Sequence, residues 1–127
     1  MGAYVVEATK STPKISLNPV THLHEITGES YPENSLSFYG PVFNWLKSYL
    51  SDAQGKVIKF SMDILYFNSS SSKMFMELFE LLDAAASAGT PIAVDWRYHE
   101  ENEVALECGE DFMEEVGSLS FNLVSYS

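Results

Sequence analysis

The spacing of apolar residues changes abruptly in the middle of the chain, and this change restricts the possible folds more than any other feature. Between Val57 and Phe67, Ile58, Phe60, Met62 and Ile64 alternate with the polar residues Lys59, Ser61 and Asp63, as expected of a strand with one buried face. After the tract Asn68 to Ser72, apolar residues recur at spacings of three and four until Gly89, which is typical of an amphipathic helix. Alternation returns from Pro91 to Tyr98. The order strand, helix, strand predicts an α/β domain.

The rest of the chain carries weaker patterns of the same two kinds. In order from the N-terminus, we expect an irregular leader over residues 1–12, short strands near Ile15–Leu17 and over Thr21–Thr27 that can form a hairpin, a helix over Glu33–Leu50, a helix within Glu100–Glu115 and a last strand over Leu119–Leu123. Proline lacks the N–H that an internal helical position needs, so Pro41 predicts a kink or a restart. With 127 residues and no internal repeat, the chain is expected to form one domain over residues 1–127.

Both central strands place charged residues on one face and large apolar residues on the other. We therefore expect helices on the apolar face and water on the charged one, because each apolar face must be buried. If the strands are neighbours, Lys59, Asp63, Asp95 and Arg97 can pair across the open face, at about 0 to 1 kcal/mol for each pair. The predicted fold is a two-layer α/β sandwich with a mixed sheet of about five strands and helices mainly on one face.

The chain is strongly acidic. Asp and Glu outnumber Lys and Arg by 18 to 7, for a formal net charge of −11. This charge repels the phosphates of nucleic acids and anionic lipids, so neither nucleic acid nor membrane is an expected partner. No apolar run reaches the ~18 residues of a membrane span. The N-terminus lacks the basic, then apolar, then small residues of a secretory signal peptide, so a cytoplasmic location is expected. The single cysteine, Cys108, can form no internal disulfide.

The tract from Asn68 to Lys73 places several hydroxyl groups where a strand ends and a helix begins. The first turn of a helix has unpaired N–H groups and the positive end of the helix dipole, so a phosphate attached there is stabilised. Lys73 lies one helical turn after Ser69 and can approach such a phosphate. The alternative is structural: Asn and Ser are favoured N-caps, and a serine run between two elements often forms a cap and a solvated turn. Spacing alone does not select one serine.

A second segment, Gly28 to Asn34, precedes the first helix. It can be a simple turn followed by a helix start, where Pro and Glu are common. It can also be a contact loop, because Tyr31 offers a large rigid surface and a hydroxyl group beside acidic and amide side chains.

The sequence gives less support to a metal site or to catalysis. His22 and His24 can share one face of a strand, but two ligands without a third make a poor metal site, so we expect neither a metal nor a cofactor. The serine tract has no adjacent glycine and no Gly-x-Ser-x-Gly elbow, which disfavours a hydrolase. We expect no catalytic residue in this chain.

Three segments taken together resemble the SiaC family of bacterial regulatory phosphoproteins. They are GESYPEN from Gly28, LYFNSSSSK from Leu65 and VDWRY from Val94. Their order and spacing are more specific than any one of them, and the resemblance spans nearly the whole chain.

The resemblance implies a fold similar to STAS-type anti-sigma-factor antagonists and a partner-switching circuit with a protein kinase and a PP2C-like phosphatase. It places the phosphorylated hydroxyl on Ser69, directly after the asparagine of the motif. It implies that the unmodified protein binds and activates a diguanylate cyclase, which raises cyclic di-GMP and favours biofilm formation. The residues expected to contact partners are Tyr31, Glu33, Asn34, Asn68, Ser70, Ser71 and Lys73.

These observations lead to one hypothesis and two alternatives. The hypothesis is that unmodified Ser69 lies within an interface and that its phosphate disrupts binding, because a dianion without a basic counterpart is costly to bury. One alternative is a constitutive adaptor that binds through Tyr31 and the exposed sheet face. The other is a small hydrolase, which needs a histidine close to one of the serines.

Overall fold

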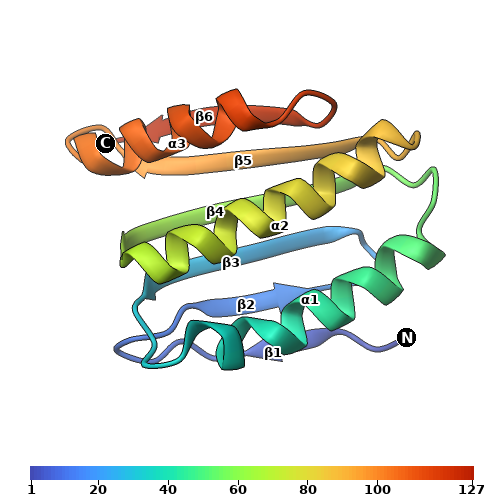
Figure 1. Cartoon of the computed structure of the whole chain (residues 1–127), viewed down its shortest axis with the longest axis horizontal. Coiled ribbons are helices and arrows are strands. Elements are labelled where there is room, and N and C mark those ends of the chain that lie inside the picture. The colour runs from blue at the N-terminus through green and yellow to red at the C-terminus, as the bar shows by residue number, and fades with distance from the viewer.

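The computed structural model describes residues 1–127 and contains six strands and three helices (Figure 1). In chain order they are β1 (Tyr4–Val6), β2 (Lys14–Leu17), β3 (Leu23–Ser30), α1 (Ser35–Asp52), β4 (Ile58–Phe67), α2 (Ser69–Ser87), β5 (Ile92–His99), α3 (Glu103–Glu115) and β6 (Ser120–Tyr126). None of the three helices combines the length and the hydropathy that a membrane-spanning segment requires.

The strands form one sheet in the order β1-β2-β3-β4-β5-β6. Pairing is antiparallel from β1 to β3 and parallel from β3 to β6, so the sheet is mixed as expected. Each parallel pair is joined by a helix. Because such crossovers are right-handed and the sheet always grows in the same direction, the three helices lie on one face (Figure 1). The prediction of a two-layer sandwich with helices on one face is confirmed.

One expectation from the sequence was wrong, and one of the two alternatives at Pro41, a restart of the helix, is excluded. The sheet has six strands rather than five, because residues 4–6 of the expected irregular leader pair with β2, Tyr4 opposite Leu17 and Val6 opposite Ile15. Three residues are too few to show alternation, so only the long-range pairing reveals this strand. The first helix also continues through Pro41 without a restart. Pro41 is exposed, so water can reach the carbonyl group that lacks its usual donor.

The core lies between the sheet and the helices, and the fit of α3 depends on one glycine. Trp96 on β5 is 1% exposed, and its Nε1–H donates a hydrogen bond to the carbonyl oxygen of Ala105 on α3, at 2.9 Å. A Cβ atom at Gly109 would come within 2.5 Å of Trp96 Cδ1. Glycine is therefore required where α3 crosses the tryptophan.

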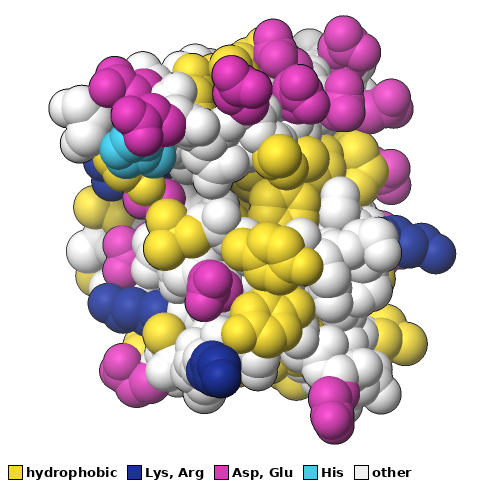
Figure 2. All heavy atoms as spheres, turned by 90° about the vertical axis from the view of Figure 1, so that its left-hand side faces the viewer, with side chains coloured by type: hydrophobic (Ala, Val, Ile, Leu, Met, Phe, Trp, Pro, Cys, Tyr) yellow, Lys and Arg dark blue, Asp and Glu magenta, His cyan; other side chains and the backbone are white.

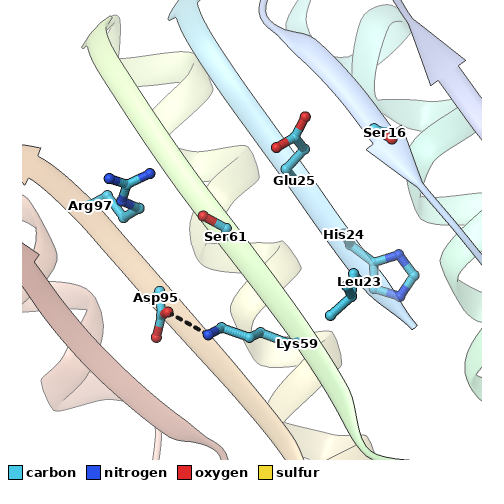
Figure 3. Close-up of a pocket in the computed structure, with 8 residues that line it drawn as sticks. All are labelled: Ser16, Leu23, His24, Glu25, Lys59, Ser61, Asp95 and Arg97. Atoms are coloured by element: carbon cyan, nitrogen blue, oxygen red, sulfur yellow. Dashed lines mark ion pairs between the residues drawn. The ribbon is translucent and has the colours of Figure 1, made fainter. Parts of the chain in front are cut away.

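The other face of the sheet is open and polar. Lys59 Nζ lies 3.1 Å from Asp95 (Figure 3), as the sequence suggested. Lys14 pairs with Glu25 at 3.2 Å. Asp63 and Arg97 do not pair with each other. Asp63 accepts a hydrogen bond from the hydroxyl group of Tyr126 at 2.9 Å, and the Arg97 guanidinium lies over the ring of the same tyrosine.

Candidate functional site

The serine tract and the Gly28–Asn34 segment meet at one end of the molecule, although 34 residues separate Asn34 from Asn68 in the sequence. The carboxyl ends of parallel strands lie at the same edge of a sheet, and β3 and β4 are parallel neighbours with Ser30 opposite Phe67. The helices that follow them, α1 and α2, both begin at this edge (left in Figure 1). We call this edge the Ser69 end.

Each helix at this edge begins with an asparagine N-cap. The Oδ1 atoms of Asn34, Asn68 and Asn102 accept hydrogen bonds from the third backbone N–H of α1, α2 and α3, at 3.0, 2.9 and 3.1 Å respectively. The cap of α2 is therefore Asn68, and the four serines are the first four residues of the helix. A cap explains the asparagine but none of the serine hydroxyl groups.

Beneath the tract, five hydroxyl groups connect α1, α2 and β3. Ser71 Oγ lies 2.7 Å from Ser30 Oγ, which lies 2.5 Å from the Tyr39 hydroxyl oxygen. Nearer the surface, Ser70 Oγ lies 2.8 Å from Ser35 Oγ. We call these five residues the hydroxyl cluster. Burial, partly offset by the Ser30 hydrogen bond, raises the pKa of Tyr39 to about 12, so its hydroxyl group stays protonated.

The four serines of the tract differ in accessibility. Ser71 is fully buried, and Ser70 is exposed but hydrogen-bonded to Ser35 and to Asn68. Ser72 is half-buried on the next position of the helix. Ser69 is exposed, and its hydroxyl group has no hydrogen-bond partner within the chain. Of the four, Ser69 therefore offers the hydroxyl group most open to an incoming enzyme.

Exposed apolar side chains lie at the same end of the molecule as Ser69. Tyr31 and Tyr66 pack edge to face with ring centroids 5.6 Å apart. Tyr66, Leu65 and Leu36 are 55%, 58% and 69% exposed. Figure 2 shows this end of the molecule, with an apolar patch at its centre and carboxylates gathered along one border. Scattered single apolar residues are common on protein surfaces, but a contiguous patch indicates a contact surface.

The residues expected to contact partners gather at this end, with one correction. Glu33, Asn34, Ser70 and Lys73 line one shallow groove between the first turns of α1 and α2. Tyr31 lies beside Tyr66. Ser71, however, is fully buried because its position in the first turn faces the core, so its side chain is not available for direct contact.

The sequence pointed to neither Tyr66 nor Leu36 as surface residues. An exposed tyrosine or leucine cannot be told from a buried one by type alone. The register irregularity after Gly28, where Ile64 pairs with Gly28 and Tyr66 with Glu29, leaves Leu65 without a partner in β3 and brings Tyr66 to the surface.

The two histidines that the sequence singled out lie at the opposite end, where β3 begins. His22 Nδ1 lies 2.5 Å from the Tyr49 hydroxyl oxygen, and His24 Nδ1 accepts the Asn18 N–H at 3.1 Å. Burial, with a smaller contribution from His22, lowers the pKa of His24 to about 4. No hydrogen bond joins a histidine to a serine, and no group of three or more His, Cys, Asp or Glu residues is placed to hold a metal ion.

A further hollow lies on the open face of the sheet (Figure 3). Its walls carry both signs of charge, from Glu25, Lys59, Asp95 and Arg97. Glu25 and Asp95 are already paired with lysines of the chain, so the hollow offers no concentrated charge of one sign.

A two-layer α/β domain with an accessible serine at the start of a capped helix, and with an apolar patch at the same end of the molecule, is the kind of small binding module that a modification can switch. The family is shown by comparison: the family model described as SiaC family regulatory phosphoprotein matches residues 6–126. The chain therefore belongs to the SiaC family of regulatory phosphoproteins.

Individual relatives agree with this assignment. A protein of Pseudomonas aeruginosa strain UCBPP-PA14, described as uncharacterized, is 34% identical over 110 residues, which cover 87% of this chain and 86% of the relative. A chain in the crystal structure of the P. aeruginosa diguanylate cyclase SiaD in complex with its activator SiaC is 32% identical, with a TM-score of 0.90 over 97% of this chain and 99% of that one. Apo-SiaC from P. aeruginosa is 31% identical, with a TM-score of 0.85 over the full length of both chains.

Proposed function

We propose that this chain, in its unmodified form, binds and activates a diguanylate cyclase, and that phosphorylation of Ser69 releases the cyclase. A protein kinase adds the phosphate and a PP2C-like phosphatase removes it, while the chain itself performs no catalysis. Two findings support this: the membership of a family of regulatory phosphoproteins, and the likeness to a chain crystallised in a complex of SiaD with its activator SiaC.

The accessibility of Ser69 is the observation that carries the proposal. A kinase must bring the acceptor hydroxyl group into line with the γ-phosphate of ATP, so a buried hydroxyl group is a poor acceptor. Ser71 fails this requirement, and Ser70 must first leave its hydrogen bond to Ser35. Ser69 meets it without any rearrangement.

The surroundings of Ser69 explain why a phosphate would end binding. The apolar side chains of Tyr31, Tyr66 and Leu36 lie at the same end of the molecule, and Lys73 is the one cation lining the groove between the first turns of α1 and α2. Burial of a phosphate dianion against such a surface costs much more than burial of a hydroxyl group. A difference of about 3 kcal/mol weakens binding more than a hundredfold.

The switch can be tested without knowledge of the kinase by the incorporation of phosphoserine during translation. The protein with phosphoserine in place of Ser69 should bind its cyclase about a hundredfold more weakly than the unmodified protein. Phosphoserine in place of Ser87, at the far end of α2, adds the same charge away from the site and should change binding less than about twofold. Candidate cyclases are SiaD of P. aeruginosa and the diguanylate cyclases of the source organism, with cyclic di-GMP synthesis as the readout.

Two outcomes would contradict the proposal. If no cyclase is bound or stimulated by the unmodified protein, the assigned output is wrong. If the Ser69 and Ser87 phosphoproteins bind a stimulated cyclase equally well, the chain is a constitutive adaptor rather than a switch.

The acceptor assignment has its own test. When the protein is phosphorylated by a kinase from the source organism, Ser69→Ala should remove nearly all incorporated phosphate, while Ser72→Ala should leave it unchanged. Mass spectrometry of the tryptic peptides provides the measurement. Phosphate retained on Ser70 to Ser72 in the Ser69→Ala protein would show that the wrong serine has been chosen.

A further inference from the structure

The two edge strands of the sheet are unlike each other. β1 has three residues, whereas β6 has seven and pairs with β5 without a register shift (Figure 1). Long edge strands are usually protected by a lysine, a proline or a bulge, because their unpaired backbone groups can pair with another chain. β6 has none of these, and residues 116–127 include no charged side chain. β6 is therefore the edge of the sheet that is open to pairing.

The free backbone groups of β6 can be identified from the alternation along the strand. The carbonyl oxygen of Tyr126 accepts a hydrogen bond from the N–H of Glu100, which follows β5, at 2.8 Å, so the backbone groups of Tyr126 face β5. Alternate residues of a strand direct these groups to opposite sides. The N–H and C=O groups of Phe121, Leu123 and Ser125 therefore face away from β5, where no other strand lies.

The helix α3 lies above this edge, and one of its flanks can be assigned to the β6 side. A Cβ atom at Gly109 would come within 2.8 Å of Leu123 Cδ2 on β6. Phe112, on the other side of the buried face of α3, packs against Phe79 of α2, with ring centroids 5.1 Å apart. The flank of α3 on the Gly109 side therefore faces the free edge, and the flank on the Phe112 side faces α2.

The flank beside the free edge carries both apolar and acidic residues. Leu106 and Met113 lie three residues before and four residues after Gly109, so they share its flank, and both are half-buried. Glu110 lies between them on the helix surface and is exposed. A strand added next to β6 would therefore meet apolar surface with a carboxylate beyond it.

We propose that the β6 edge binds an extended, basic segment of another protein, which adds a seventh strand to the sheet. Backbone hydrogen bonds to Phe121, Leu123 and Ser125 hold the segment, and alternate side chains give specificity. The side chains on the helical face are arginine or lysine. Their aliphatic stems lie along Leu106 and Met113, and their charged ends reach Glu110.

Charge favours such a segment over a second copy of the chain. Two copies joined through β6 would bring their α3 helices to the same junction. Residues Glu103–Glu115 include six acidic side chains and no basic one, so the two helices would repel each other. A basic segment meets the same carboxylates with the opposite charge.

A peptide of alternating arginine and valine, about as long as β6, is a suitable probe. Methyl groups on the arginine nitrogens of the backbone block antiparallel pairing, and methyl groups on the valine nitrogens block parallel pairing, while the charge stays the same. One of these two peptides should bind the protein at least about tenfold more weakly than the unmethylated peptide in a calorimetric titration. Equal affinity of all three peptides would show attraction by charge alone and would overturn the proposal.

The edge itself can be blocked at Ser125. Its backbone groups do not bond to β5, so Ser125→Pro removes an outward N–H group without breaking the ladder and should keep the melting temperature. Ser125→Pro should weaken binding of the unmethylated peptide at least about tenfold, and Ser125→Ala, which keeps the N–H group, should stay within about twofold. If the free protein is a dimer that Ser125→Pro dissociates, the edge belongs to a second copy and the proposal is wrong.

The contribution of α3 has a matched pair of variants that does not depend on a change in the strand. Glu110→Lys and Asp111→Lys change the net charge equally, but Asp111 lies about 100° further around the helix, away from β6. Glu110→Lys should weaken peptide binding at least about fivefold and Asp111→Lys less than about twofold. The peptide should also slow amide hydrogen exchange at Phe121, Leu123 and Ser125. Equal effects of the two lysine variants, or unchanged exchange at these amides, would overturn the proposal.

Discussion

The two ends of α1 share one kind of hydrogen bond but differ in the residues that surround it. At each end a tyrosine of the helix forms a short hydrogen bond to a polar side chain of the sheet layer: Tyr39 to Ser30 at one end, and Tyr49 to His22 at the other, both at 2.5 Å. Burial raises the pKa of both tyrosines to about 12. The two contacts differ in what lies behind them.

Behind Tyr39 the hydrogen bonds continue to the first turn of α2. Ser30 bonds to Ser71, which is two residues from the exposed Ser69 on the same helical turn. Behind Tyr49 the network ends in aromatic packing, where the rings of Trp45 and His24 both lie 4.8 Å from the Tyr49 ring. One end therefore has hydroxyl groups in and below the first turn of a helix, and the other encloses a titratable ring in the core.

This difference predicts opposite sensitivities. The Ser69 end should respond to a covalent charge at its surface and change binding without unfolding. The histidine end should respond to protons and change stability without any effect on binding. Three measurements test this division.

The largest expected effect on stability comes from His24. Its pKa of about 4 in the folded protein lies below the ordinary value of 6.5, so the unfolded chain binds the proton more tightly. Stability is therefore complete above about pH 6.5 and falls between there and pH 4, at about 1.4 kcal/mol per pH unit, or about 3 kcal/mol in all. Urea unfolding at pH 7, 5.5 and 4.5 gives the slope.

A second histidine provides the control. His99 also accepts a backbone N–H through Nδ1, from Glu101 at 3.0 Å, but it lies on the open side at the edge of the sheet. His24→Gln should remove most of the change in the free energy of unfolding between about pH 6.5 and pH 4, and His99→Gln should retain that change. A slope that survives His24→Gln would place the titrating group elsewhere and break the division between the two ends.

Most helices and strands could be predicted from the sequence, because an element buried on one face has apolar residues at a regular spacing. Ile58, Phe60 and Met62 alternate with polar residues, and all three are fully buried in β4. The strand β1 was missed because three residues show no period, and its pairs, such as Tyr4 with Leu17 and Val6 with Ile15, join residues that are not neighbours in the sequence.

Less of the site could be predicted from the sequence, because its contacts join residues that are far apart in the chain. The tract was correctly placed at the junction of β4 and α2. The Ser30–Ser71 and Ser35–Ser70 hydrogen bonds, however, span 41 and 35 residues and depend on the register of β3 against β4. The same register decides which serine is exposed, so spacing alone could not separate Ser69 from its neighbours.

A smaller loss is expected at the Ser69 end from the centre of the hydroxyl cluster. Ser30→Ala removes the shared partner of Tyr39 and Ser71 and leaves two buried hydroxyl groups to be satisfied, at a cost of about 2 kcal/mol in the free energy of unfolding. Ser16→Ala changes a serine on the open face that has no side-chain hydrogen bond, and should stay within about 0.5 kcal/mol. Unlike the loss at His24, this cost should be the same at pH 7 and pH 5, and a pH-dependent cost would contradict the division.

The smallest effect is expected at the cap of α2. Asn68→Ala removes the acceptor for the Ser71 N–H and for the Ser70 hydroxyl group, and should cost about 1 kcal/mol by thermal or urea unfolding. Asn68→Asp keeps a capping oxygen and should cost less than about 0.5 kcal/mol, yet it places a carboxylate beside Ser69. If surface charge governs binding at this end, Asn68→Asp should lower the affinity for the cyclase although its free energy of unfolding is nearly unchanged. Asn68→Ala should lower the free energy of unfolding but affect the affinity less. A larger loss of affinity in Asn68→Ala than in Asn68→Asp would show that binding depends on the stability of the first turn rather than on its charge.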